Sequence, residues 1–148
     1  MLKSYKDKSK NKPYIIVEIS DKIMVNIMKK VRQILNIYSL HKNNIMGEYV
    51  TVAVLDTGIY NHPDFGERII KYKDCVNGKT AIYDDEGHGT HVTGILAGDG
   101  KMSNGFFKGI APKSDIVSLK VLDKRGIGKE DNVISGIWWI IDNGKKYN

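Results

Sequence analysis

The chain has 148 residues, of which 41% are hydrophobic and 27% are charged, and its formal net charge is +6. This length suits one domain, and the composition is that of a globular protein rather than a disordered one. The single cysteine, Cys75, excludes an intrachain disulfide framework. No run approaches the ~18 apolar residues of a membrane span, and no apolar segment of ~7–15 residues marks a secretory signal. We therefore expect a cytoplasmic protein with no membrane partner.

The positive charge is concentrated near the N-terminus. Residues 1–48 hold ten Lys and Arg against four Asp and Glu, a difference of six, whereas residues 49–148 hold thirteen of each. A basic segment can bind nucleic acid. However, the lysines between Lys3 and Lys12 alternate with Ser, Asp and Asn, without an aromatic ladder. We expect a flexible, solvated leader and no nucleic-acid partner.

Two elements are predicted in the N-terminal region. Residues 14–19 favour a short strand entered at Pro13. Between residues 21 and 40 the apolar side chains recur at steps of three and four, which predicts an amphipathic helix. We accordingly divide the chain into a basic leader plus helix over residues 1–46 and a main domain over residues 47–148.

Strand and helix patterns alternate through the main domain. Residues 50–55 form a continuous run of apolar residues and Thr, which predicts a strand buried on both faces, and further strands are predicted over residues 68–76 and 115–122. Helices are predicted over residues 88–97 and from about residue 133 to residue 143. This alternation indicates an α/β fold with a mainly parallel sheet.

Asp56 follows the first predicted strand of the main domain and precedes Thr57 and Gly58. Functional groups gather at the carboxyl ends of strands in open α/β sheets. A carboxylate in this place can orient a histidine, bind a metal or cap a loop, and the position alone leaves these roles open.

A glycine-flanked histidine, His88, lies at the entrance of the next predicted helix, in the sequence GHGTHVTG. Glycines beside a histidine let another backbone or a substrate approach closely. Taken alone, His88 and His91 also resemble a metal-binding pair on one helical turn, with the acidic residues 84–86 nearby. Both roles are open on spacing alone.

Three motifs occur together: VAVLDTGIYNHPDF, then DDEGHGTHVTGILAG, then KGIAPKSDIVSLKVLDKRGIGKEDNVISGIWWIIDN. In this order they resemble the subtilisin-like serine peptidases, or subtilases, over residues 47–148, and most of all the intracellular members of bacteria. The resemblance implies a mainly parallel sheet with helices on both faces. It also implies a domain truncated in its middle, because a whole catalytic domain needs roughly twice the residues present after residue 47.

The resemblance assigns roles to particular residues. Asp56 matches the aspartate of the catalytic triad and His88 its histidine, so that Asp56 would orient His88 and stabilise its charged ring. His91 then packs or bonds locally. Gly126, Ile127 and Gly128 match the edge segment that pairs with an extended polypeptide substrate.

The nucleophile of the family lies in a later Gly-Thr-Ser motif, and the oxyanion asparagine also lies beyond residue 148. The serines of this chain lack that setting: Ser4, Ser9, Ser20, Ser39, Ser103, Ser114, Ser118 and Ser135. We expect the 148 residues alone to be catalytically inactive and to need the C-terminal half of the domain as a partner. An open sheet edge and uncovered apolar faces would favour aggregation.

No cofactor is expected, and no metal is assigned. Asp64, in NHPDF, lies where many subtilases bind calcium, but residues 98–107 do not match the asparagine-rich ligand loop of the secreted members. Asp64 is instead expected to complete a turn after Pro63.

Three alternative functions are weighed against a serine peptidase. VAVLDTG also resembles the Asp-Thr-Gly strand of aspartic peptidases, which share a proton between two aspartates, but HGTHVTG has no role there. A truncated pseudoenzyme or binding module is the second. The third is a metal-dependent hydrolase that uses His88, His91 and residues 84–86.

Overall fold

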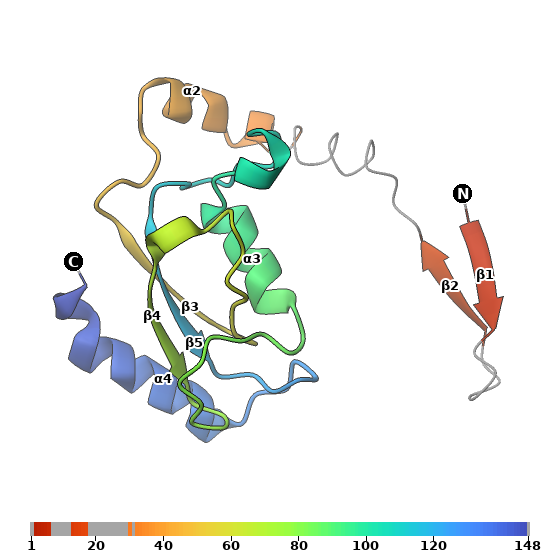
Figure 1. Cartoon of the computed structure of the whole chain (residues 1–148), viewed down its shortest axis with the longest axis vertical. Helices are drawn as coiled ribbons and strands as arrows, with labels where there is room; N and C mark the ends of the chain where they lie inside the picture. The colour runs from red at the N-terminus through yellow and green to blue at the C-terminus, as the bar shows by residue number, and fades with distance from the viewer. Residues whose placement is uncertain (1, 7–12, 18–29, 31, 148) are drawn as a thin grey trace. The chain divides into compact units, whose positions relative to one another are not determined.

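The computed structural model describes residues 2–6, 13–17, 30 and 32–147. They fall into two compact units, Met1–Leu35 and Asn36–Asn148 (Figure 1), which are described separately below. Among the described helices, none is long and apolar enough to cross a membrane.

The first unit contains an antiparallel strand pair. β1 (Leu2–Lys6) pairs with β2 (Pro13–Val17), with Leu2 opposite Val17 and Lys6 opposite Pro13. The strand predicted over residues 14–19 is therefore present, although it begins at Pro13. The prediction of a flexible leader is wrong for residues 2–6. The backbone groups of this segment pair with those of β2, which contains a run of β-branched residues.

The amphipathic helix predicted over residues 21–40 is interrupted. Residues 18–29 and 31 lie outside the described residues, and residues 30 and 32–34 are helical. The chain then turns at Asn36, which has a left-handed backbone (φ 52°), before α2 (Ile37–Lys42) begins. Asparagine tolerates this conformation better than most side chains do, so one helical pattern in the sequence becomes two helices.

The second unit is built on a parallel sheet with the strand order β3-β5-β4. β3 covers Thr51–Asp56, β4 covers Ile69–Asp74 and β5 covers Asp115–Lys120. The three predicted strands are confirmed: β3 is displaced by one residue, and β4 and β5 are shorter than predicted. Their last residues lie in one row, because Asp56 and Asp74 both pair with Lys120. The register therefore brings three polar side chains to one end of the sheet.

A helix covers each face of this sheet (Figure 1). α3 (His88–Ala97) places Ala97 against Ile116 of β5 on one face. α4 (Glu130–Asn143) contributes to the core on the other face, where Val117 and Leu119 of β5 are buried. Alternate residues of β5 thus serve opposite cores, as a strand buried on both faces requires. The predicted α/β fold is confirmed.

β3 lies at an edge of the described sheet, and this corrects the prediction that it is buried on both faces. Ala53 is exposed, and the other residues of β3 are only partly buried. A cavity of about 230 Å³ lies beside this edge, lined by Thr51, Ala53, Val117, Trp139, Ile140, Gly144 and Tyr147. α4 also exposes a stripe of apolar side chains at helical spacing: Ile134, Ile137, Trp138 and Ile141.

Candidate active site

Asp56 is the last residue of β3, and its side chain is 13% exposed. The backbone N–H of Thr57 donates to Asp56 Oδ1 at 2.7 Å. The strand end therefore holds a carboxylate in a fixed, mostly buried position while its oxygens still accept bonds from outside the strand.

His88 is the first residue of α3, and its ring faces the Asp56 carboxylate. Nδ1 lies 2.9 Å from Oδ1 and 3.0 Å from Oδ2, so the ring donates to Asp56 through that nitrogen. The His88 side chain is 59% exposed. A nitrogen held by a carboxylate and a ring open to solvent are what a general base needs.

The approach of α3 to the Asp56 loop depends on Gly89. A Cβ at this position would lie 2.2 Å from the carbonyl oxygen of Gly58 and 3.1 Å from Cβ of Asp56. Only glycine fits here, because the obstructing atom at 2.2 Å belongs to the backbone. This contact explains physically why a glycine directly follows His88.

The pKa of His88 is raised above its ordinary value of 6.5, first by the hydrogen bond to Asp56 and then by the charge of that carboxylate. Asp56 therefore favours the protonated imidazolium over the neutral ring. This preference is useful to a base that must become positively charged during a reaction.

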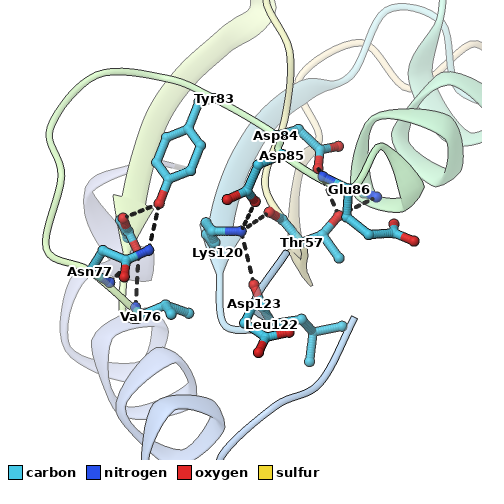
Figure 2. Close-up of polar contacts among 12 residues, drawn as sticks. Thr57, Val76, Asn77, Tyr83, Asp84, Asp85, Glu86, Lys120, Leu122 and Asp123 are labelled. Carbon is cyan, nitrogen blue, oxygen red and sulfur yellow. Dashed lines mark hydrogen bonds and ion pairs between the residues drawn. The ribbon is translucent and has the colours of Figure 1, made fainter. Parts of the chain in front are cut away.

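Asp84 joins the Asp56 loop to the start of α3 (Figure 2). Its carboxylate accepts from the Thr57 hydroxyl at 2.9 Å and from the backbone N–H groups of Gly87 at 2.8 Å and Thr90 at 2.9 Å. Thr57 Oγ1 in turn accepts from the N–H of Gly89 at 2.9 Å. The free donors at the helix start are thereby satisfied by side chains of both segments.

The pKa of Asp84 is lowered to about 2. Burial acts in the opposite direction, and the hydrogen bonds from Thr90, Gly87 and Thr57 outweigh it. From the sequence, Asp84 is predicted only as a possible metal ligand. An acidic residue a few positions before a helix start is the sequence pattern that could have predicted its bonds to the N–H groups of α3.

The other acidic residues near His88 are also engaged. Asp85 forms an ion pair with Lys120 at 2.6 Å, and Glu86 accepts from the backbone N–H of His88 at 2.8 Å. Over the described residues, no group of three or more His, Cys, Asp and Glu side chains is gathered as a metal site. His91 is exposed on α3, and its N–H donates to the carbonyl of Gly87.

The predicted substrate-edge residues form an open loop before α4. Gly126 has a left-handed backbone (φ 72°), and Ile127 is 55% exposed. The N–H of Ile127 donates to Asp123 Oδ1 and its carbonyl accepts from the N–H of Asp123, which closes the loop. Gly128 forms an antiparallel bridge with Leu122, which lies two residues after β5 and leads into the loop.

Comparison with known proteins places this arrangement in a family. The Subtilase family of S8 peptidases matches residues 47–146. The chain belongs to the subtilase family. The match contains the strand that ends at Asp56, the helix that begins at His88 and the loop of residues 126–128.

Individual subtilases resemble the same stretch. The chain is 50% identical over 97 residues to "Serine protease AprX" of Bacillus subtilis and 43% identical over 105 residues to "Intracellular serine protease" of Paenibacillus polymyxa. These alignments cover 66% and 68% of this chain. A solved "cold adapted subtilisin-like serine proteinase" matches 66% of the chain with a TM-score of 0.58 and 37% identity.

This chain spans only part of the length of those subtilases. The aligned segments amount to 22% of AprX, 32% of the Paenibacillus protease and 34% of the solved proteinase chain. Over residues 32–147, the only side chain hydrogen-bonded to the His88 ring is that of Asp56.

Asp64 connects two loops of the subtilase domain. Its Oδ1 accepts from the N–H of Met102 at 2.8 Å, and its carbonyl accepts from the N–H of Asp99 at 2.9 Å. A turn with a bond from the N–H of Gly66 to the carbonyl of Pro63 surrounds it. The predicted turn after Pro63 is confirmed.

Proposed function

We propose that this chain supplies the aspartate and the histidine of a serine-type endopeptidase, with Asp56 and His88 in those roles. The observation that carries the proposal is the contact between His88 Nδ1 and both oxygens of Asp56 at 2.9 and 3.0 Å. Membership of the subtilase family supports a peptide bond as the substrate.

The chemistry follows from the two ring nitrogens of His88. Nδ1 donates to Asp56, so the neutral ring holds its lone pair on Nε2. Nε2 removes the proton of a serine hydroxyl as the serine oxygen attacks the scissile carbonyl, and Asp56 stabilises the imidazolium formed. The imidazolium then protonates the leaving amine. In the second half-reaction His88 takes a proton from water, whose oxygen attacks the acyl-enzyme, and returns a proton to the serine.

The serine and the oxyanion asparagine are proposed to lie outside these 148 residues, in the C-terminal half of the domain. The partly exposed edge strand β3 and the apolar stripe of α4 support a docking surface for that half. It follows that the 148-residue chain alone is inactive, because acyl transfer lacks its nucleophile.

We propose that the polypeptide substrate pairs with the loop of residues 126–128. Ile127 uses both of its backbone groups within the loop and Gly126 donates its N–H to Asp123, so pairing would fall to the Gly126 carbonyl and to Gly128. Residues 1–46 are proposed to be a basic leader plus helix that precedes the peptidase domain, since the family match begins at residue 47. The name of the Paenibacillus relative supports a cytoplasmic location.

The geometry at Asp56 favours this function over an aspartic peptidase. An aspartic peptidase pairs its carboxylate with a second carboxylate and shares one proton between them. Both Asp56 oxygens instead face a histidine ring. The acidic residues 84–86 are likewise engaged with amides or with Lys120, which leaves a metal-dependent hydrolase without support.

A chimera tests the proposal. Residues 47–146 replace the matching segment of AprX, to which the chain is 50% identical. We expect the chimera to cleave peptides, to lose about 10⁴-fold or more of its kcat with His88→Ala, and to be labelled by an active-serine reagent.

His91→Ala is the matched control, since His91 lies one turn further along α3 and is exposed. It should keep the activity of the parent chimera. Peptidase activity from the 148-residue chain by itself, or a chimera indifferent to His88→Ala, would contradict the proposal.

A further inference from the structure

Lys120 is a fully buried lysine at the carboxyl end of β5. A buried ammonium group is costly unless every proton has an acceptor. Lys120 Nζ donates to three groups: the carbonyl of Thr57 at 2.6 Å, the carbonyl of Leu122 at 2.9 Å and Asp85 Oδ1 at 2.6 Å (Figure 2). Its donor capacity is therefore completely used.

The three acceptors belong to three different parts of the candidate active site. Thr57 directly follows Asp56, Asp85 lies three residues before His88, and Leu122 leads into the loop of residues 126–128. In the sheet Lys120 pairs with Asp56 itself. One ammonium group thus joins the segment of Asp56, the segment of His88 and the start of the loop of residues 126–128.

We propose that Lys120 is a positioning residue, which keeps Asp56 and His88 Nδ1 within hydrogen-bond distance by tying the Thr57 carbonyl to Asp85. The inference rests on the proposed function of these two residues. The Lys120 side chain is fully buried, so it acts through the segments it joins.

The side chains beside Lys120 support a fixed position for its ammonium group. The Tyr83 ring centroid lies 5.1 Å from Nζ, and the Tyr83 hydroxyl donates to Asp74 Oδ2 at 2.7 Å. Burial and the bond to Asp74 raise the pKa of Tyr83 to about 12, so the phenol stays neutral and keeps donating. Asp74 in turn ends β4, the other strand paired with Lys120.

The test is an NMR titration of His88 in the full 148-residue chain with Lys120→Met. The direct electrostatic effect of losing a nearby positive charge is to raise the pKa of His88. Loss of positioning acts in the opposite direction, because a lengthened Asp56–His88 bond lowers that pKa toward 6.5. The sign of the change therefore separates the two effects.

We expect Lys120→Met to lower the pKa of His88 by about half a unit or more. Lys113→Met is the matched control, since Lys113 forms an exposed ion pair with Glu48 at 2.7 Å, and it should leave the pKa of His88 unchanged. An unchanged or higher pKa of His88 in folded Lys120→Met would overturn the inference.

A second pair of variants decides the question if Lys120→Met does not fold. Asp85→Asn breaks one tie at a partly exposed carboxylate, and Glu86→Gln removes a charge that acts on His88 directly. Positioning predicts the larger fall of the His88 pKa in Asp85→Asn, whereas a larger or equal fall in Glu86→Gln would refute it.

The variant Asp56→Asn separates failure of the proposed function from failure of the proposal for Lys120. If Asp56→Asn fails to lower the pKa of His88, the Asp56–His88 pair of the proposed function fails. If it lowers that pKa and Lys120→Met does not, only the role of Lys120 fails.

Discussion

The chemistry at the level of single residues depends on one hydrogen bond between a mostly buried carboxylate and an exposed ring. Asp56 is held by its own strand end, whereas His88 is held by the helix that it begins. The bond between them orients the ring and favours its protonated form. Asp56 therefore both orients the His88 ring and stabilises its positive charge, as the proposed role of His88 as a general base requires.

The raised pKa of His88 predicts how the stability of the chain depends on pH. A group whose pKa is higher in the folded state stabilises folding fully below its unfolded value, here near 6.5, and this contribution is lost as the pH rises through the folded value. Asp56→Asn should thus destabilise the chain more at about pH 5 than at about pH 9. Urea unfolding at both pH values measures the difference, and an equal loss at the two would be inconsistent with the pair.

The lowered pKa of Asp84 predicts a dependence of stability on pH with the opposite sign to that of His88. Its pKa is lowered to about 2, so its contribution is present above the unfolded value near 3.8 and is lost as the pH falls through the folded value. Asp84→Ala removes the acceptor of the first α3 amides and should cost about 1–2 kcal/mol of unfolding free energy at neutral pH. Asp131→Ala, in the exposed first turn of α4, is the control and should cost less. Chemical unfolding at pH 7 measures the unfolding free energy of both variants, and an equal loss in the two would contradict the prediction.

At the level of elements, the site depends on how closely α3 approaches the Asp56 loop. Gly89→Ala places a methyl group against the Gly58 carbonyl and should destabilise the chain by about 1–3 kcal/mol. Gly94→Ala is a matched control on the same helix, because a Cβ there meets nothing within 4 Å. It should instead stabilise the chain by up to about 1 kcal/mol. Thermal unfolding of the two variants compares them, and equal effects would contradict the close approach.

The elements that sequence analysis predicted are those with a local pattern. β3, β5, α3 and α4 each carry a run or periodicity within their own residues, and Asp56 and His88 were found through motifs. Strand β1 was missed because its polar residues become a strand only by pairing with β2. The role of Lys120 could not be predicted from the sequence, because its partners Thr57 and Asp85 lie 63 and 35 residues away along the chain.

For the main unit as a whole, the decisive feature is apolar surface that the described residues do not cover. The stripe of α4 keeps Ile137 46% exposed and Trp138 60% exposed, beside a sheet whose edge strand β3 is itself partly open. Contiguous exposed apolar side chains at helical spacing mark a surface that another segment covers. In the proposed function that segment is the C-terminal half of the peptidase domain.

This surface predicts opposite effects of one double variant in two settings. Ile137→Lys with Trp138→Lys should reduce self-association of the 148-residue chain, measured by light scattering, because two exposed apolar groups are replaced by charges. In the AprX chimera the same pair should destabilise the fold by several kcal/mol, since each buried side chain contributes about 1.5–3 kcal/mol. Thr80→Lys with Ala81→Lys adds the same charges to an exposed loop and should do neither. A chimera that tolerates charges on the stripe would show that the C-terminal half of the domain docks elsewhere.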